Sequence, residues 1–133
     1  MRRREDGTIT VMTIGFLLFI GFLAVVVVNS SAAFLQRQEL DNVADGAALA
    51  AADGLSRDTF YREGDVTLDN GQARELVADY VSQPGTRVVE VRTDDDQVHV
   101  RLERTIGLAL KPPGWSSRTT IVSEATAQLR TSP

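Results

Sequence analysis

The chain has 133 residues, a formal net charge of −4 and no cysteine. That length fits one small domain, and the lack of cysteine excludes disulfides, thiol catalysis and thiolate metal sites. Residues 1–6 hold three of the 14 basic and two of the 18 acidic residues, so 11 and 16 remain from Arg37 onward. Since this part has no excess of positive charge to neutralise phosphates, we expect no nucleic-acid partner.

Residues 8–28 form an apolar stretch without a charged residue. As a helix rising about 1.5 Å per residue, the stretch would measure about 32 Å, against a hydrocarbon core of about 30 Å. Its many Leu, Ile, Phe and Val residues favour insertion by about 4 to 8 kcal/mol. The sequence therefore predicts a transmembrane helix over 8–28, with the lipid bilayer as a partner.

Two alternatives stay open for this stretch. It could be the buried core helix of a soluble protein, although the remaining chain is small and polar. It could also be a secretory signal cleaved at the small residues 29–33, although it exceeds the usual apolar length of about 7 to 15 residues. Arg2, Arg3 and Arg4 precede the stretch, which predicts a cytoplasmic lead-in over 1–7 and an extracytoplasmic C-terminal part.

The helix is expected to continue as an alanine-rich stem over 29–54, with Gly54 as its C-cap. Apolar residues recur there at three- and four-residue steps and form one narrow stripe. The stripe could pack on the chain's own domain, or it could contact other copies or partner helices. The candidate partner contacts are Leu40, Val43, Ala44, Asp45, Ala47, Ala48 and Ala51.

Residues 55–133 are expected to form an extracytoplasmic head. A loop over 56–68 should lead to a second helix over 71–82, capped by Asp69 or Asn70 and ended by Pro84-Gly85.

Strands should follow the second helix. Val89 and Val91 alternate with charged residues, and after a turn at 94–97 a second alternating run begins at Val98, which predicts a hairpin with one wet face. A loop over 110–115 should precede a last strand over 119–129, with Ile121 and Leu129 inward. The predicted fold class is α+β: a long transmembrane and stem helix, then a small head with one short helix and a three-stranded antiparallel sheet.

Three features invite a chemical interpretation. Asp94-Asp95-Asp96 could bind a hard cation, but a solvated turn explains it as well, since no spaced further ligand follows. His99 stands on the wet face without a nucleophile or carboxylate arrangement that would make it a base. Trp115 could anchor at a membrane surface or an interface, although we expect it to pack over the sheet edge. The sequence predicts no catalytic residue, metal site or cofactor.

The first 54 residues resemble the TadE/TadG-like pilus-assembly family of bacteria. The resemblance rests on a charged lead-in with a glycine before the membrane helix, at 3–11, and on the alanine-rich block at 35–52. It implies a minor, pilin-like component of the tight-adherence pilus and secretion apparatus, which contacts other subunits through its stem. Residues 55–133 match no motif beyond the general pattern of a pilin-like head.

The resemblance also raises the question of processing at Gly7. A prepilin peptidase generally cuts after a glycine before an apolar helix, and filament-forming pilins are similar in a glutamate at the fifth position after the cut. Met12 stands there instead, and no acidic residue lies between Gly7 and Arg37 to pair with a buried new amino terminus. We therefore expect the chain to keep residues 1–7 and not to be a bulk filament subunit.

The function expected from these observations is that of a structural, non-enzymatic, membrane-anchored pilus or secretion component. The alternative is a membrane-anchored module that binds or senses an extracytoplasmic ligand.

Overall fold

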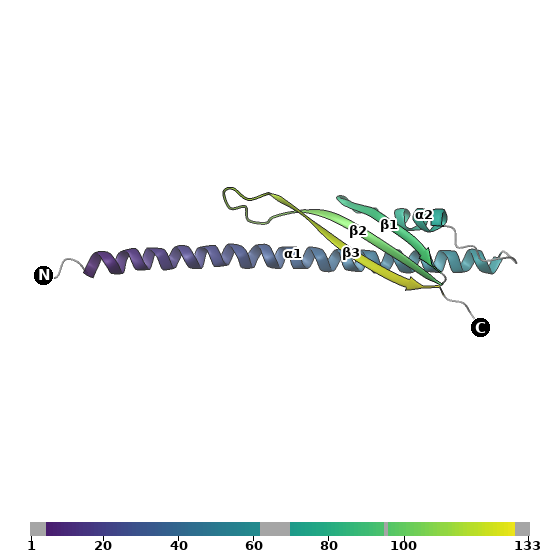
Figure 1. Ribbon diagram of the computed structural model, residues 1–133, viewed down its shortest axis with the longest axis horizontal. Coiled ribbons are helices and arrows are strands. Elements are labelled where there is room, and N and C mark those ends of the chain that lie inside the picture. Colours follow the sequence, from purple (N-terminus) through teal and green to yellow (C-terminus); the bar gives the residue numbers. More distant parts are fainter. Residues whose placement is uncertain (1–4, 62–69, 95, 130–133) are drawn as a thin grey trace.

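The computed structural model describes residues 5–61, 70–94 and 96–129. Its elements are, in chain order, α1 (Glu5–Tyr61), α2 (Asn70–Tyr80), β1 (Thr86–Asp94), β2 (Gln97–Gly107) and β3 (Arg118–Gln128). α1 runs through the whole length of the molecule, and α2 and the sheet lie along its C-terminal half (Figure 1). The predicted α+β fold, with a long helix, a short helix and an antiparallel sheet, is confirmed. Arg2, Arg3, Arg4, Asp69 and Asp95 lie outside the described residues.

α1 is one continuous helix of 57 residues, which corresponds to about 86 Å at the usual rise. It contains a segment long and apolar enough to cross a membrane, and that segment is not buried against any described part of the chain. From residue 7 to residue 28 only Val25 is even partly buried. The apolar part of α1 therefore stands free of the head, as a membrane span would.

The expected end of the stem at Gly54 is wrong, because α1 continues to Tyr61. The loop predicted from residue 56 is thus helical over its first six residues, and its remainder lies outside the described part of the chain. Gly54 has a different role. A Cβ placed there would lie 2.6 Å from Cδ1 of Leu76 on α2, so the glycine allows a close approach of the two helices rather than a helix end.

The sheet has the order β1-β2-β3, with both pairs antiparallel. β2 alternates regularly, with its buried positions facing α1 and its other positions facing solvent, as the sequence pattern predicted. Ile121 and Leu129, expected to point inward, are half-buried and pack on the core. The core thus lies between α1, α2 and one face of the sheet; its largest fully buried side chains are Leu40, Val77, Val98, Val100 and Leu102.

β1 departs from the predicted alternation at Val89. The pairing with β2 passes from Val88 opposite Leu102 to Glu90 opposite Arg101, so Val89 is an extra residue in a β-bulge. As a result Val88 packs on the core and Val89 is exposed. The expectation that Val89 shares an inward face with Val91 is therefore wrong.

Two tight turns of the same kind shape the head. Gly85 and Gly114 have positive φ angles of 79° and 86°, and each follows a proline. Thr86 N donates to Gln83 O, and Trp115 N donates to Pro112 O. Proline followed by a glycine with positive φ is the arrangement that a type II turn requires. The first turn ends the connection from α2, and the second lies in the loop between β2 and β3.

α2 begins at Asn70, close to the predicted start, and ends at Tyr80, two residues before the predicted end. Oδ1 of Asn70 accepts hydrogen bonds from the backbone N and from Oγ1 of Thr93, at 2.9 and 2.7 Å. The side chain of Asn70 therefore joins the start of α2 to the end of β1. Ala73 and Val77 are buried on the side of α2 that faces the core.

Candidate functional site

The structure places six of the seven predicted stem contacts inside the head. Each of them is less than a tenth exposed, and together they form the α1 side of the core: Leu40, Val43, Ala44, Ala47, Ala48 and Ala51. They face α2, β2 and β3. Asp45, the seventh, is exposed. The stripe therefore packs on the chain's own domain, which is one of the two interpretations that the sequence left open.

Partner contact through the same residues stays a prediction, and the structure shows what it would require. Ala44, Ala47 and Ala51 are 0% exposed, so a partner could reach them only if the sheet or α2 moved away. Small side chains there let α2 and the sheet approach α1 closely. Gly46 has the same effect, since a Cβ at this position would lie 2.7 Å from Cζ of Tyr80 on α2.

The side of α1 that points away from the sheet and α2 remains open. Along the stem, exposed residues recur at three- and four-residue steps on this side, and we call them the uncovered stem face: Leu35, Gln38, Asn42, Asp45 and Leu49. Leu35 and Leu49 are 63% and 50% exposed. Within the described chain no element covers these two large apolar side chains, so this face is accessible to another helix.

Arg104 fastens the sheet to the stem. Arg104 is 6% exposed. Its Nε donates to Oγ1 of Thr86 at 2.8 Å, and its Nη2 donates to Oε1 of Gln83. Its Nη1 lies 3.4 Å from Oε2 of Glu39 on α1. Buried cations are tolerated when their N–H groups find such partners. Arg104 is not among the residues expected from the sequence, although the alternation of β2, continued past Leu102, places this charge on the inward face.

A second polar contact joins the sheet to the stem. The hydroxyl of Ser123, 5% exposed on β3, donates to Oδ1 of Asp41 on α1. Together with the contact between Arg104 and Glu39, it fixes the rotation and the position of the sheet along the helix axis. The apolar stripe alone would allow the sheet to slide, because successive alanines offer similar surfaces.

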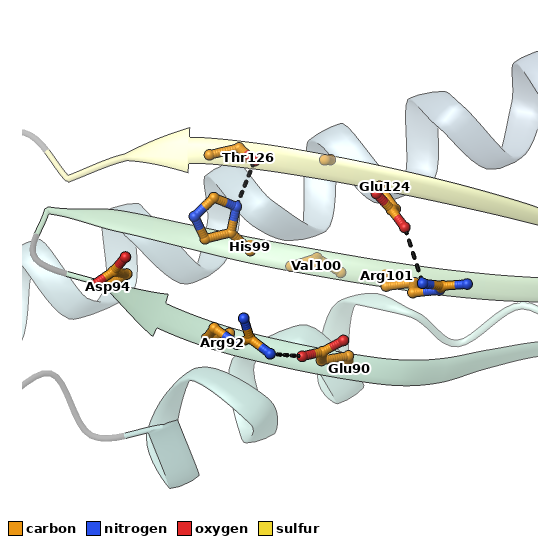
Figure 2. A pocket seen from close by; sticks show the side chains of 9 residues that line it. Glu90, Arg92, Asp94, His99, Val100, Arg101, Glu124 and Thr126 are labelled. Carbon is orange, nitrogen blue, oxygen red and sulfur yellow. Dashed lines mark hydrogen bonds and ion pairs between the residues drawn. The ribbon is translucent and has the colours of Figure 1, made fainter.

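The solvent face of the sheet carries a shallow depression of about 230 Å³. Figure 2 shows that its charged side chains come from all three strands and that both arginines pair with a glutamate. Arg101 lies 3.1 Å from Glu124, Arg92 lies 2.5 Å from Glu90, and Nδ1 of His99 shares a hydrogen bond of 2.8 Å with Oγ1 of Thr126. These are exposed surface pairs, each worth about 1 kcal/mol or less.

His99 lies on the solvent face of the sheet, and Asp94 and Asp96 lie at one end of it. Nδ1 of His99 shares its hydrogen bond with the hydroxyl of Thr126 on the neighbouring strand. Among the described residues, no three His, Asp or Glu side chains are grouped closely enough to hold a metal ion. Asp94 and Asp96 flank the hairpin turn and are exposed.

The loop over 108–117 extends from the sheet along α1 toward the N-terminus (Figure 1). It is fastened to α1 at one point. Nδ2 of Asn29 donates to Leu110 O at 2.7 Å, and Leu110 N donates to Oδ1 of Asn29 at 2.8 Å. Trp115 is 53% exposed, so the expectation that it packs over the sheet edge is wrong. No local pattern indicates the contact between Asn29 and Leu110, because the two residues are 81 positions apart.

Residues 7–54 match the family model described as putative Flp pilus-assembly TadE/G-like. The match covers the apolar span and the stem, 48 of the 133 residues, and confirms the resemblance found in the sequence. No curated protein and no solved structure matches the chain. The head therefore has no relative among these comparisons, and its role has to be argued from its own residues.

Proposed function

We propose that the chain is a structural, membrane-anchored component of an Flp/Tad-type pilus or a related secretion apparatus, similar in build to a minor pilin. One observation carries this proposal: the helix that contains the apolar span also forms one wall of the head's core. Residues 7–54, which match the pilus-assembly family, are these two parts of α1. The role we propose is one of assembly and not of catalysis.

The continuity of α1 gives the proposal its physical content. No glycine or proline lies in α1 between Val28 and Leu40, where the span passes into the head, so a flexible joint is not built into the sequence there. A force or rotation applied to the head is thus passed directly to the membrane helix. A ligand-binding module on a flexible tether would not need such a stiff connection, whereas a subunit that is packed among other helices would.

Contacts with other subunits are proposed to use the uncovered stem face. The alanine stripe is occupied by the head, so the remaining side of α1 supplies the surface for partner helices. Leu35 and Leu49 would supply apolar contact, and Asp45, exposed between them in sequence, would take a cation from the partner. This arrangement keeps Asp45 among the partner contacts and assigns the six apolar residues to the core.

Co-purification from the native membrane tests the proposal. A tagged chain should bring down pilus-assembly or secretion subunits after mild detergent extraction, and deletion of its gene should reduce piliation or surface adherence. Leu49→Arg should weaken the co-purification while the head stays resistant to proteolysis. Thr119→Arg, a matched change at an exposed position on β3, should leave it intact. Normal piliation in the deletion strain, with no pilus subunit recovered, would refute the role.

The depression on the sheet does not support the alternative function of an extracytoplasmic sensor for a charged ligand. A site built to bind a charged ligand would keep charged groups free for it, but Arg92 and Arg101 are each paired with a glutamate.

A further inference from the structure

The loop between β2 and β3 lies beside α1 at the C-terminal end of its apolar stretch. Asn29, to which Leu110 is bonded through both backbone groups, directly follows the apolar stretch over 8–28. The uncharged run from Gly7 to Gln36 has 30 residues. As a helix it is about 45 Å long, which equals a bilayer with both of its headgroup layers. Within this run the apolar stretch over 8–28 is about 32 Å long and matches the hydrocarbon core of about 30 Å, so Asn29, which follows it, would stand at the outer edge of that core.

The burial along α1 changes at the same level of the helix. Val25 lies one turn before Asn29 on the same side of the helix, and it is half-buried while the other residues over 7–28 are exposed. Ala32 and Ala33, one turn after Asn29, are half-buried as well. The partly covered side of α1 thus begins within the apolar stretch, and the loop runs alongside it (Figure 1).

The composition of the loop is that of a segment in contact with lipid headgroups. Between Glu103 and Glu124 the chain has no acidic residue but contains three cations, although the whole chain is acidic. Two of these cations, Lys111 and Arg118, are exposed at the loop. Leu110 and Trp115 are 43% and 53% exposed. Tryptophan is the side chain enriched at membrane–water boundaries, because its ring is apolar and its N–H is a donor.

The loop is also stiff enough to hold these side chains at one depth. Leu108 N donates to Ser117 O at its base, and the Pro113-Gly114 turn closes on Trp115 through the bond from its N to Pro112 O. Proline and a satisfied turn leave Trp115 little freedom to fold back onto the head.

We propose that the tip of this loop, with Leu110 and Trp115, inserts into the outer headgroup layer of the membrane that α1 crosses, and that Asn29 positions it. Lys111 and Arg118 then face lipid phosphates. The head would be held at two points, α1 and the loop, which prevents it from rotating about the helix axis. The inference rests on α1 crossing the bilayer and not on the pilus role, so the two can fail separately.

Trp115 is the chain's only tryptophan, which makes the test direct. The full chain is reconstituted in vesicles of phosphatidylcholine and phosphatidylglycerol, some with a spin label at the headgroup and some with the label at the acyl-chain end. We expect blue-shifted emission from Trp115 and at least about threefold stronger quenching by the shallow label than by the deep one, as for a residue of the interfacial belt. Emission of a hydrated indole, open to iodide and unaffected by either label, would overturn the proposal.

Two controls separate the loop from the rest of the head. A chain with Trp115→Phe and Asp94→Trp places the only tryptophan at the opposite end of the sheet, and neither lipid label should quench it. Asn29→Ala removes both bonds to Leu110 and should lower shallow quenching of Trp115, whereas Asn42→Ala, at an exposed stem position, should not. If Asn29→Ala and Asn42→Ala give the same quenching, the positioning role of Asn29 is refuted.

Discussion

Arg104 on the sheet and Glu39 on α1 face each other at 3.4 Å, and their exposure is very unequal: the arginine side chain is 7% exposed and the glutamate 55%. The arginine is therefore the buried member of the pair, and its N–H groups are the ones that depend on protein partners. Its other N–H groups bond to Thr86 and Gln83, so the guanidinium joins α1 to the segment that enters β1.

Exchange of Arg104 should be much more costly than exchange of Glu39. Lysine cannot reproduce three diverging N–H contacts, so Arg104→Lys should lower the free energy of unfolding by about 1 to 3 kcal/mol. Glu39→Gln should lower it by less than about 1 kcal/mol, because its exposed carboxylate is screened by water. Chemical denaturation of the full chain in detergent measures both. Equal effects would show that the pair, and not the buried guanidinium, provides the stability.

Gly46 and Tyr80 should show strong coupling in a double-mutant cycle. Alanine normally stabilises a helix interior by about 1 kcal/mol relative to glycine. In the native chain Gly46→Ala should give no such gain, because the new methyl group would meet the ring of Tyr80. In a Tyr80→Ala background the same substitution should stabilise the head by about 1 kcal/mol. Additive effects, measured by thermal unfolding, would contradict the close contact.

The packing of the alanine stripe inside the head can be tested by placing a tryptophan at a buried and at an exposed position of the stem. Ala47 is 0% exposed, so Ala47→Trp should unfold or strongly destabilise the head, by about 3 kcal/mol or more. Leu49→Trp, two residues on and half exposed, should change stability by no more than about 0.5 kcal/mol. Both are measured on the purified chain without partners. A stable head in Ala47→Trp would mean that α1 does not carry the core.

The helices, the hairpin of β1 and β2 and the inward face of β2 could be predicted because each follows from a local pattern. The apolar run, the alanine steps and the alternation from Val98 onward are visible within short windows of sequence. The stripe could not be assigned to one partner, because a helix face that suits the chain's own sheet suits another helix as well.

What sequence reasoning missed depends on residues far apart in the chain. Local sequence indicates a helix end at Gly54. The residue that occupies the space beside this glycine, Leu76, is 22 positions away and cannot be found from a local pattern. Val89 was placed inward because a single bulged residue leaves no trace in the alternation. The loop that contains Trp115 is bonded to Asn29 through Leu110, and a polar residue at the end of an apolar run gives no sign of its bonding partner.

The orientation of the chain can be tested with cysteine labelling, since the chain has no cysteine of its own. Three arginines precede the uncharged span and no charge opposes insertion, so the lead-in should stay in the cytoplasm and the head should be exported. Thr119→Cys, exposed on β3, should react with a membrane-impermeant maleimide in spheroplasts, whereas Arg3→Cys should react only after lysis. If Arg3→Cys reacts in intact spheroplasts and Thr119→Cys does not, the chain has the opposite orientation in the membrane. If the labelled Thr119→Cys chain is found outside the membrane fraction, the apolar segment is cleaved. That result would refute the membrane anchor, and with it the insertion of the β2–β3 loop into the same membrane.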